Sequence, residues 1–451
     1  MIRCGFDWIS KRKSVTAMRG LSRRPSTGEL RGLRKTRAMR LYVEVTHTER
    51  NDMNAGIPRV VRNILKNLLE LGPAEGIAIV PTVFRKKSFV AVSPKDVLKN
   101  TAVEQETCGI SPLRVEWANR VRRGFSVSRR HLLELVGLHS SIVQLIEAEP
   151  NERHVLLLLD ASWAYDIWPA VEALKTRGVR VVGVIYDLIP ITHRHTVVEH
   201  LAQAFEPWLR GEMRCADQIV CISRFIANIV EGYFEKQMAL LGIARDIPVS
   251  TFRLGADGDL GKSGNVVQER VLRLRSDSSP FFLMVGTVEP RKNHRQVLDA
   301  FKELWAQGFA ARLVIVGERD WKSEELLTKI REDPEAERRL FLIRNASDTD
   351  LRWLYENATA LVMASDIEGC GLPMVEAHQL GLPVICSNIP VFVEFAVEGT
   401  AFFRLGDVDD LARVIKAHVT SDGARVRRSG RWITWRESTQ ELLSAVVHAV
   451  P

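Results

Sequence analysis

Apolar runs alternate with amphipathic segments along most of the chain, which predicts alternating strands and helices. Continuous runs such as VLLLLD (155–160), VRVVGVIYDLIP (179–190) and DQIVCIS (217–223) are typical of strands buried on both faces of a parallel sheet. Between them lie segments such as WPAVEALKTRG, in which apolar residues recur at helical spacing. We therefore predict an α/β fold in which helices cover both faces of parallel sheets.

Two such α/β blocks follow one another along the chain. The first opens with a predicted strand over residues 40–48 (RLYVEVTHT) and a helix that starts near Gly56 and ends at Gly72. The second opens with FFLMVGTVEPRKNH at 281–294, and LPVICSN at 382–388 is its last predicted strand. We expect two Rossmann-like halves that face each other across a cleft, with ligands at the carboxyl ends of the strands.

A polar stretch between the blocks and the two chain ends complete the predicted organisation. Trp432 and Trp435 belong to a closing helical segment. The predicted parts are a basic disordered tail at 1–39, an N-terminal domain at 40–262, a linker at 263–280, a C-terminal domain at 281–420 and a helical tail at 421–451.

The excess positive charge lies in the first forty residues. They contain 12 Lys or Arg and 2 acidic residues, whereas the whole chain has a net charge of +8, so residues 41–451 sum to −2. This segment can contact anionic lipid headgroups, at about 1 kcal/mol per basic residue near the surface, or act as a targeting segment. An extension without a role, or translation that starts at Met39, explains the same pattern.

Composition otherwise indicates a globular protein of the cytoplasm. The chain is 46% apolar, yet no apolar run approaches the ~18 residues of a membrane span. The membrane alternative is peripheral contact of the basic tail at the inner membrane face. Six cysteines form no C-x-x-C pair and no zinc-like cluster, which suits a reducing compartment.

We predict no cofactor, no metal site and no nucleic-acid partner. Three D-x-D strings, at 257–259, 348–350 and 407–409, fit turns or helix starts better than metal ligation. The G-x-S-x-G, P-loop and G-x-G-x-x-G patterns are absent, which argues against serine hydrolases, P-loop NTPases and dehydrogenases.

The stretch SDIEGCGLPMVEA, residues 365–377, carries the most informative chemistry. Glu368 and Glu376 stand eight positions apart, with Gly369 and Gly371 between them. The stretch follows an apolar run, so we interpret it as strand, glycine turn and helix. A helix N-terminus favours a phosphate, and two flanking acids suit sugar hydroxyls. The pattern indicates a nucleotide sugar; an ordinary turn with a Glu that compensates the helix dipole is the alternative.

A charged loop in the same half offers cations for that phosphate. VGTVEPRKNH places Arg291 and Lys292 just after a predicted strand. A diphosphate that leaves a sugar carries about two negative charges, which cations stabilise in a dry site. A solvated Arg-Lys pair is the alternative. In the first half, Gly56 lies in a similar loop and is either part of a phosphate or sugar site or a simple turn residue.

The 365–377 stretch resembles the E-x7-E donor motif of the retaining GT-B glycosyltransferases of family four, the glycosyl transferases group 1 family. VMASDIEGCGLPMVEAHQLGLPVICSN matches the family pattern nearly end to end. GIPRVVRN, YDLIP and GTVEPRKN are similar to segments of mannosyl- and rhamnosyltransferases of bacterial surface polysaccharide. The resemblance implies a GT-B fold whose C-terminal tail returns to pack on the first domain.

The resemblance also implies roles for residues of the C-terminal half. Glu368 is expected to contact the donor sugar, and Glu376 is expected to hold the ribose hydroxyls. The amides of Gly371 and Leu372 are expected to face sugar and phosphate. Lys292 matches a family lysine that binds the diphosphate.

Two positions of this half depart from the family pattern. A basic residue usually follows the strand glycine, but Thr287 follows Gly286 here, and Arg291 is expected to take over part of that role. Cys370 stands where the family commonly has an aromatic residue, which alters the pocket wall.

In the N-terminal half, the YDLIP segment aligns with the family's H-D-L loop. Tyr186 replaces the histidine that approaches the reacting sugar, while Asp187 matches the pattern. Ser223 matches a family serine near the cleft, or it is a helix N-cap.

These observations predict a retaining, metal-independent hexosyltransferase. GDP-mannose is the first expected donor, followed by UDP- or dTDP-sugars, and the expected acceptor is a saccharide or lipid-linked saccharide in surface polysaccharide synthesis. The resemblance implies transfer without an obligatory covalent nucleophile, in which the leaving phosphate takes the acceptor proton. The alternatives are an epimerase or hydrolase that acts on nucleotide sugars, and a non-catalytic subunit that keeps the GT-B fold.

Overall fold

The computed structural model describes six stretches of the chain, all within one compact unit, Ala38–Pro451. The predicted basic tail lies outside the described residues, apart from its last two. The described residues are 38–51, 56–98, 140–257, 267–318, 323–420 and 432–448.

A seven-stranded sheet organises the first half, in the order β3-β2-β1-β4-β5-β6-β7. Every neighbouring pair is parallel except β2 and β3, which form an antiparallel hairpin. Order along the sheet reverses on either side of β1, which creates the switch point where open α/β sheets bind ligands. The strands are β1 (Met39–Glu44), β2 (Ile77–Arg85), β3 (Ser88–Ala91), β4 (Arg153–Leu158), β5 (Arg180–Ile185), β6 (Gln218–Cys221) and β7 (Val249–Thr251).

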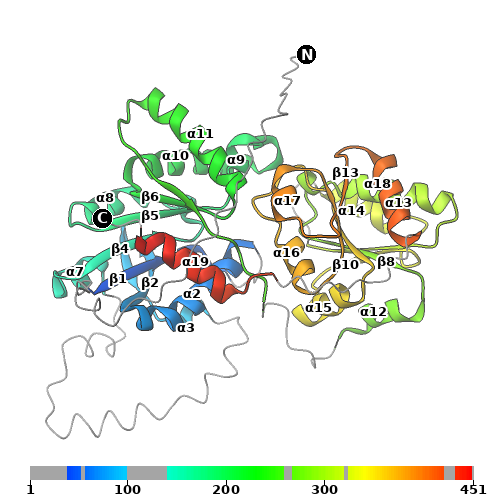
Figure 1. Cartoon of the computed structure of the whole chain (residues 1–451), viewed down its shortest axis with the longest axis horizontal. Helices are drawn as coiled ribbons and strands as arrows, with labels where there is room; N and C mark the ends of the chain where they lie inside the picture. Colours follow the sequence, from blue (N-terminus) through cyan, green and yellow to red (C-terminus); the bar gives the residue numbers. More distant parts are fainter. Residues whose placement is uncertain are drawn as a thin grey trace, which may run out of the picture. The chain divides into compact units, whose positions relative to one another are not determined.

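Helices cover both faces of this sheet (Figure 1). Alternate residues of β1 point into separate cores: Leu41 and Val43 join the core beneath α2, whereas Tyr42 joins the core on the opposite face. The helices are α1 (Thr46–Glu49), α2 (Gly56–Leu71), α3 (Pro94–Val97), α7 (Ile142–Ala148), α8 (Trp168–Lys175), α9 (Ile189–Thr192), α10 (Glu199–Cys215) and α11 (Arg224–Leu241), with 3₁₀ turns η1 (Gly72–Glu75), η2 (Ser162–Ala164) and η3 (Arg194–Thr196).

The predicted first strand over residues 40–48 is too long at its C-terminal end. The strand stops at Glu44, whose side-chain Oε1 accepts the Thr46 N–H at 2.8 Å. That bond helps the chain to turn into α1, because a carboxylate two residues back offers the backbone a partner outside the sheet.

A six-stranded parallel sheet organises the second half, in the order β10-β9-β8-β11-β12-β13. The prediction that LPVICSN is the last strand is wrong, because β13 follows it and pairs with β12. With only three residues, β13 is too short to show a periodicity in sequence. The strands are β8 (Phe281–Val285), β9 (Arg312–Val316), β10 (Leu340–Ile343), β11 (Ala360–Met363), β12 (Val384–Ser387) and β13 (Ala401–Phe403).

The helices of this half follow the predicted rhythm. Ser347 and Asp350 form a reciprocal capping box at the start of α15, so this D-x-D string is a helix start as predicted. The helices are α13 (His294–Ala306), α14 (Glu324–Arg331), α15 (Asp348–Asn357), α16 (Leu372–Gln379), α17 (Pro390–Phe395) and α18 (Val408–Thr420), with the 3₁₀ turn η5 (Pro290–Lys292).

The described part of the predicted linker is packed against the second sheet. It forms α12 (Glu269–Leu272) and η4 (Arg273–Ser276). The buried Arg312 of β9 donates to the Leu274 carbonyl at 2.8 Å and to the Asp277 carbonyl at 2.9 Å. Residues 267–280 therefore belong structurally to the second half.

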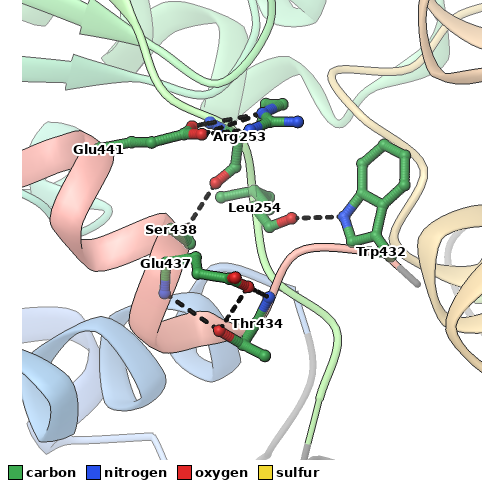
Figure 2. Close-up of polar contacts among 7 residues, drawn as sticks. All are labelled: Arg253, Leu254, Trp432, Thr434, Glu437, Ser438 and Glu441. Atoms are coloured by element: carbon green, nitrogen blue, oxygen red, sulfur yellow. Dashed lines mark hydrogen bonds and ion pairs between the residues drawn. The ribbon is translucent and has the colours of Figure 1, made fainter.

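The last helix, α19 (Trp435–His448), packs beside α2 of the first half (Figure 1). Figure 2 shows the segment after β7 in contact with it: Ser438 Oγ donates to the Arg253 carbonyl at 2.5 Å, and Trp432 Nε1 donates to the Leu254 carbonyl at 2.8 Å. Arg253 also forms an ion pair with Glu441. A helix from the far end of the chain thereby completes the first half.

Candidate functional site

The loop after β8 brings two cations to the carboxyl edge of the second sheet. Gly286 has φ 141, a conformation that favours glycine. A Cβ added there would lie 3.7 Å from Lys292 Cε, so the lysine side chain lies directly against this glycine. The 3₁₀ turn η5 carries Arg291 and Lys292, and α13 begins two residues later. Thr287, the departure from the family pattern, is half-buried beside Gly286.

The loop after the neighbouring strand β11 brings Glu368 to these cations. Lys292 Nζ contacts Glu368 Oε1, and Arg291 lies 2.9 Å from Oε2. Ser365 Oγ also donates to Oε1 at 2.8 Å. The two loops were predicted to converge, and the structure places all three charged groups in one cluster.

Burial and charge act in opposite directions on this cluster. Burial alone would raise the pKa of Glu368, but the charges of Lys292 and Arg291 outweigh it and lower the pKa to about 2. Glu289 lies 2.6 Å from Arg291 and, with Glu368, raises the pKa of that guanidinium despite its burial. Glu368 and Arg291 therefore stay ionised across the physiological range.

Asp187 of the first half lies next to this cluster. Burial raises its pKa, while the Ile189 N–H, which donates to its Oδ1 at 2.9 Å, and the charge of Arg291 lower it. Gly369 comes so close to this loop that an added Cβ would overlap the Tyr186 carbonyl. A side chain at Gly369 would push the two loops apart.

Tyr186 and Ser223 have partners that sequence did not reveal. The Tyr186 hydroxyl donates to the Leu159 carbonyl at 2.7 Å, so its proton is held inside the first half. Ser223 Oγ accepts the Ile226 N–H at 3.1 Å as the N-cap of α11, and it donates to the Gly369 carbonyl at 3.3 Å. The N-cap alternative for Ser223 is therefore confirmed, and the same hydroxyl also contacts the loop of Gly369 in the second half.

Glu376 lies in a second polar cluster on α16. It is 3% exposed, and its Oε2 accepts a 2.7 Å bond from the Tyr355 hydroxyl. Its Oε1 lies 2.7 Å from Arg59 of α2, which belongs to the first half. Burial, followed by the charge of Glu376, raises the pKa of Tyr355 well above its ordinary value, so the hydroxyl remains a donor.

Three further predicted residues lie at helix starts. Gly371, with φ 81, precedes α16, and Leu372 is the first residue of that helix. A Cβ at Gly371 would lie 2.8 Å from the Phe392 ring, so glycine is required sterically as well. Gly56, with φ 57, begins α2, and an added Cβ there would meet nothing within 4 Å. Glycine at position 56 is therefore favoured by the backbone conformation and not by crowding, and open space lies beside it.

A cavity of about 190 Å³ adjoins Asp187 and Arg291. Aromatic rings of the first half form much of its wall: Trp163 lies 5.3 Å from Phe205 and 5.6 Å from Trp208, measured between ring centroids. Its lining residues are Ile57, Trp163, Ile185, Tyr186, Asp187, Ile189, Pro190, Val197, Leu201, Phe205, Trp208, Glu289 and Arg291. The cavity joins an apolar aromatic surface to the charged cluster.

Sequence reasoning missed several members of the site. Glu289 adjoins the recognised cations, and a carboxylate beside an Arg-Lys pair was a readable signal. Arg59 stands within the quoted GIPRVVRN segment, but no local pattern indicates a partner more than 300 positions away. The aromatic wall comes from η2 and α10, whose tryptophans read as ordinary core residues.

Two searches were confined to the described part of the chain. Among those residues, no group of three His, Cys, Asp or Glu side chains could hold a metal ion. None of the helices described is both long and apolar enough to cross a membrane.

Comparison with known proteins gives a family match in the second half. A family model described as "Glycosyl transferases group 1" matches residues 269–430. The match spans the Arg291–Lys292 loop and both acids of the 365–377 stretch.

Curated relatives are bacterial. The chain is 34% identical over 278 residues to the serotype-specific mannosyltransferase WbdA of Escherichia coli, a match that covers 60% of this chain and 34% of WbdA. It is 23% identical over 266 residues to the O-antigen chain mannosyltransferase RfbU of Salmonella typhimurium, which covers 56% of this chain and 69% of RfbU. The chain thus spans about a third of the length of WbdA.

Solved structures share the fold. The Anabaena protein Alr3699/HepE, solved in complex with UDP and glucose, matches with a TM-score of 0.55 at 12% identity, over 90% of this chain and 99% of that chain. Sucrose-phosphate synthase from Thermosynechococcus elongatus matches with a TM-score of 0.53 at 17% identity, over 91% and 98%. These likenesses establish the two-halved GT-B architecture.

Proposed function

Residues 269–430 are a glycosyl transferases group 1 domain, and from this premise we propose that the protein is a retaining glycosyltransferase that moves a hexose from a nucleotide diphosphate sugar to a saccharide hydroxyl. One observation carries the proposal. Two cations from the loop after β8 and one acid from the loop after β11 meet beside a cavity of about 190 Å³. This arrangement supplies positive charge for the diphosphate and a carboxylate that accepts hydrogen bonds from sugar hydroxyls. The cavity supplies a space for the second substrate.

The donor is proposed to lie across α16. Lys292 and Arg291 bind the diphosphate, assisted by the positive N-terminus of α16 at Gly371 and Leu372. Glu368 then exchanges part of its contact with the cations for hydroxyls of the hexose, and Glu376 accepts the ribose hydroxyls. Ionised carboxylates suit this task because each has about four acceptor sites.

Transfer is proposed to depend on charge stabilisation at the leaving phosphate. As the glycosidic bond to the phosphate breaks, Lys292 and Arg291 stabilise the charge that develops on its oxygens. The acceptor hydroxyl forms the new bond on the same face and passes its proton to the leaving phosphate. The half-buried Asp187 lies at the same point and favours the positive charge that forms on the sugar ring.

The acceptor is proposed to enter the aromatic cavity. Trp163, Phe205 and Trp208 offer ring faces to the apolar face of a saccharide, while Asp187 and Glu289 offer acceptors to its hydroxyls. The names of the curated relatives favour mannose as the transferred hexose, so GDP-mannose is the first donor to test, followed by UDP- and dTDP-sugars. A lipid-linked saccharide in surface polysaccharide synthesis is the proposed acceptor.

Isothermal titration with GDP-, UDP- and dTDP-sugars tests the proposal, combined with mass spectrometry of products formed with lipid-linked acceptors. One nucleotide class should bind, and the acceptor mass should increase by one hexose. Lys292→Ala should reduce transfer by about 10²–10³-fold, the range for loss of one transition-state donor. Lys329→Ala, which removes an exposed pair with Glu325, is the matched control. No binding to any nucleotide sugar would refute the proposal, and release of free hexose alone would favour a hydrolase.

A further inference from the structure

The ion pair between Arg59 and Glu376 joins the two halves at the proposed donor site. Arg59 is the fourth residue of α2, which begins at Gly56, and Glu376 lies on α16. Arg59 Nη1 and Glu376 Oε1 are 2.7 Å apart, and the side chains are only 9% and 3% exposed. A charge-assisted bond at this depth is expensive to break, because removal of one partner leaves a buried charge.

The hydroxyl of Tyr355 completes the set around the carboxylate. It donates to Glu376 Oε2 at 2.7 Å, and its own side chain is 1% exposed. The two oxygens of Glu376 thus contact residues on different helices, Oε1 on α2 and Oε2 on α15. The carboxylate plane is fixed, and further lone pairs on both oxygens remain for a ligand.

We propose that Arg59 and Tyr355 are positioning residues that orient Glu376 to receive the two ribose hydroxyls of the donor nucleotide. This inference rests on the proposed function. Arg59 adds a property that Tyr355 lacks, because it comes from the opposite half. The ribose-binding carboxylate has both of its contacts only while the halves are together, so nucleotide binding and this contact between the halves favour each other.

A cycle of ribose-modified nucleotides tests the inference. The probes are GDP, 2′,3′-dideoxy-GDP, UDP and 2′,3′-dideoxy-UDP, titrated calorimetrically into the full chain. Removal of one hydrogen bond to a charged group weakens binding by about tenfold or more, so the wild-type protein should prefer the ribose form of one base by at least that factor. In Arg59→Ala this preference should fall at least about fivefold, whereas affinity for the dideoxy form should change much less.

Two further variants separate positioning from general damage. Tyr355→Phe keeps the ring and removes the hydroxyl, so its ribose preference should fall in the same direction. Arg59→Lys keeps the charge and should recover part of the preference. Glu70→Ala, on the same helix α2, removes a half-exposed pair with Arg436 and should leave the preference unchanged.

The outcomes distinguish the two proposals. If wild-type protein binds none of the four nucleotides and no dTDP-sugar, the proposed function fails. If it binds dTDP-sugars alone, the function stands and the ribose role is overturned, because that sugar has no 2′-hydroxyl. If wild-type protein binds with a clear ribose preference that Arg59→Ala and Tyr355→Phe both retain, the function stands and the positioning role is overturned. A preference that falls equally in Glu70→Ala would also overturn it, since the effect would then come from α2 as a whole.

Discussion

Lys292 and Glu368 form a direct ion pair between the loops that follow β8 and β11, with side chains that are 12% and 7% exposed. Arg291 approaches the same carboxylate from its other oxygen. A single acid thus contacts both cations at one point. In the proposed function a diphosphate offers the same cations more negative charge, so the residues that stabilise these loops also prepare them for the donor.

Glu368→Gln should weaken both transfer and stability. Two buried cations would lose their shared anion, so the free energy of unfolding at pH 7 should fall by about 2–4 kcal/mol, near the cost of breaking a buried pair. The folded pKa of about 2 lies below the ordinary value of 4.5, so the stabilisation from the charge is present above about pH 4.5 and is lost as pH falls toward 2. Urea unfolding between pH 2.5 and 7 should show a constant gap between variant and wild type above about pH 4.5 and a narrowing gap below it; a gap that stays constant down to about pH 2.5 would contradict the assignment.

Glu212→Gln should stabilise the protein at alkaline pH. Glu212 of α10 is fully buried, neither carboxylate oxygen has a hydrogen-bond partner in the described structure, and burial raises its pKa to about 8. Between pH 4.5 and 8 the folded state holds a proton that the unfolded state releases, so unfolding free energy declines as pH rises.

The variant removes that decline and should gain on the order of 2 kcal/mol at pH 8.5 relative to wild type. Melting temperatures at pH 5.5, 7 and 8.5 measure the effect. Glu206→Gln, an exposed position on the same helix, should show no such trend. Equal melting temperatures of Glu212→Gln and wild type at pH 8.5 would refute the buried-acid interpretation.

Gly255→Ala should loosen α19 from the first half. A Cβ at Gly255 would overlap the main-chain nitrogen of Trp435 and lie 2.6 Å from the Thr434 carbonyl carbon, and main chain moves less readily than a side chain. We expect a loss of about 1–3 kcal/mol, as for overpacked interiors, and faster proteolysis within α19.

Gly232→Ala is the matched control for that substitution. Gly232 lies inside α11, and its added Cβ would meet nothing within 4 Å. Alanine should therefore stabilise this helix by roughly 0.5–1 kcal/mol. If Gly255→Ala and Gly232→Ala change the melting temperature by the same amount and in the same direction, Gly255 does not pack tightly against the main chain of Trp435.

Trp163→Ala should weaken binding of the acceptor more than binding of the donor. Trp163 is half-buried and lines the cavity, so its loss removes a stacking surface without touching the cation cluster. We expect the KM for the acceptor to increase about tenfold, with the Kd of the donor nucleotide unchanged. Tyr165→Phe, which removes the hydroxyl that Arg50 contacts outside this cavity, should leave both constants unchanged. If Trp163→Ala raises only the Kd of the donor, the acceptor does not bind in this cavity.

Much of the fold was predictable because buried parallel strands are long apolar runs and their helices end at glycines. Each element that was missed or misplaced has a physical reason. β13 has three residues, too few for a period, and β1 ends early because Glu44 captures the Thr46 N–H. Helical turns at 269–276 escaped notice because their sequence is polar, although Val271 and Leu274 are buried.

The candidate site likewise contains some contacts that could be predicted from the sequence and others that could not. Lys292 and Glu368 could be paired from sequence because each follows a strand that ends at the same sheet edge. Arg59 could not be paired with Glu376, since their contact depends on how α2 and α16 approach each other. The alignment predicted that Tyr186 lies at the cleft. Its hydroxyl donates to a main-chain carbonyl, a partner that a pattern of side chains does not reveal.

The position of α19 has a consequence for synthesis on the ribosome. Trp435, Leu442 and Val446 fill the core beside α2, yet they are made only after the whole second half, which carries the proposed nucleotide site. The first half therefore waits for residues that follow the second half before its apolar surface is covered. For the same reason, chimaeras that exchange the nucleotide half between relatives should keep this terminal helix with its original N-terminal partner.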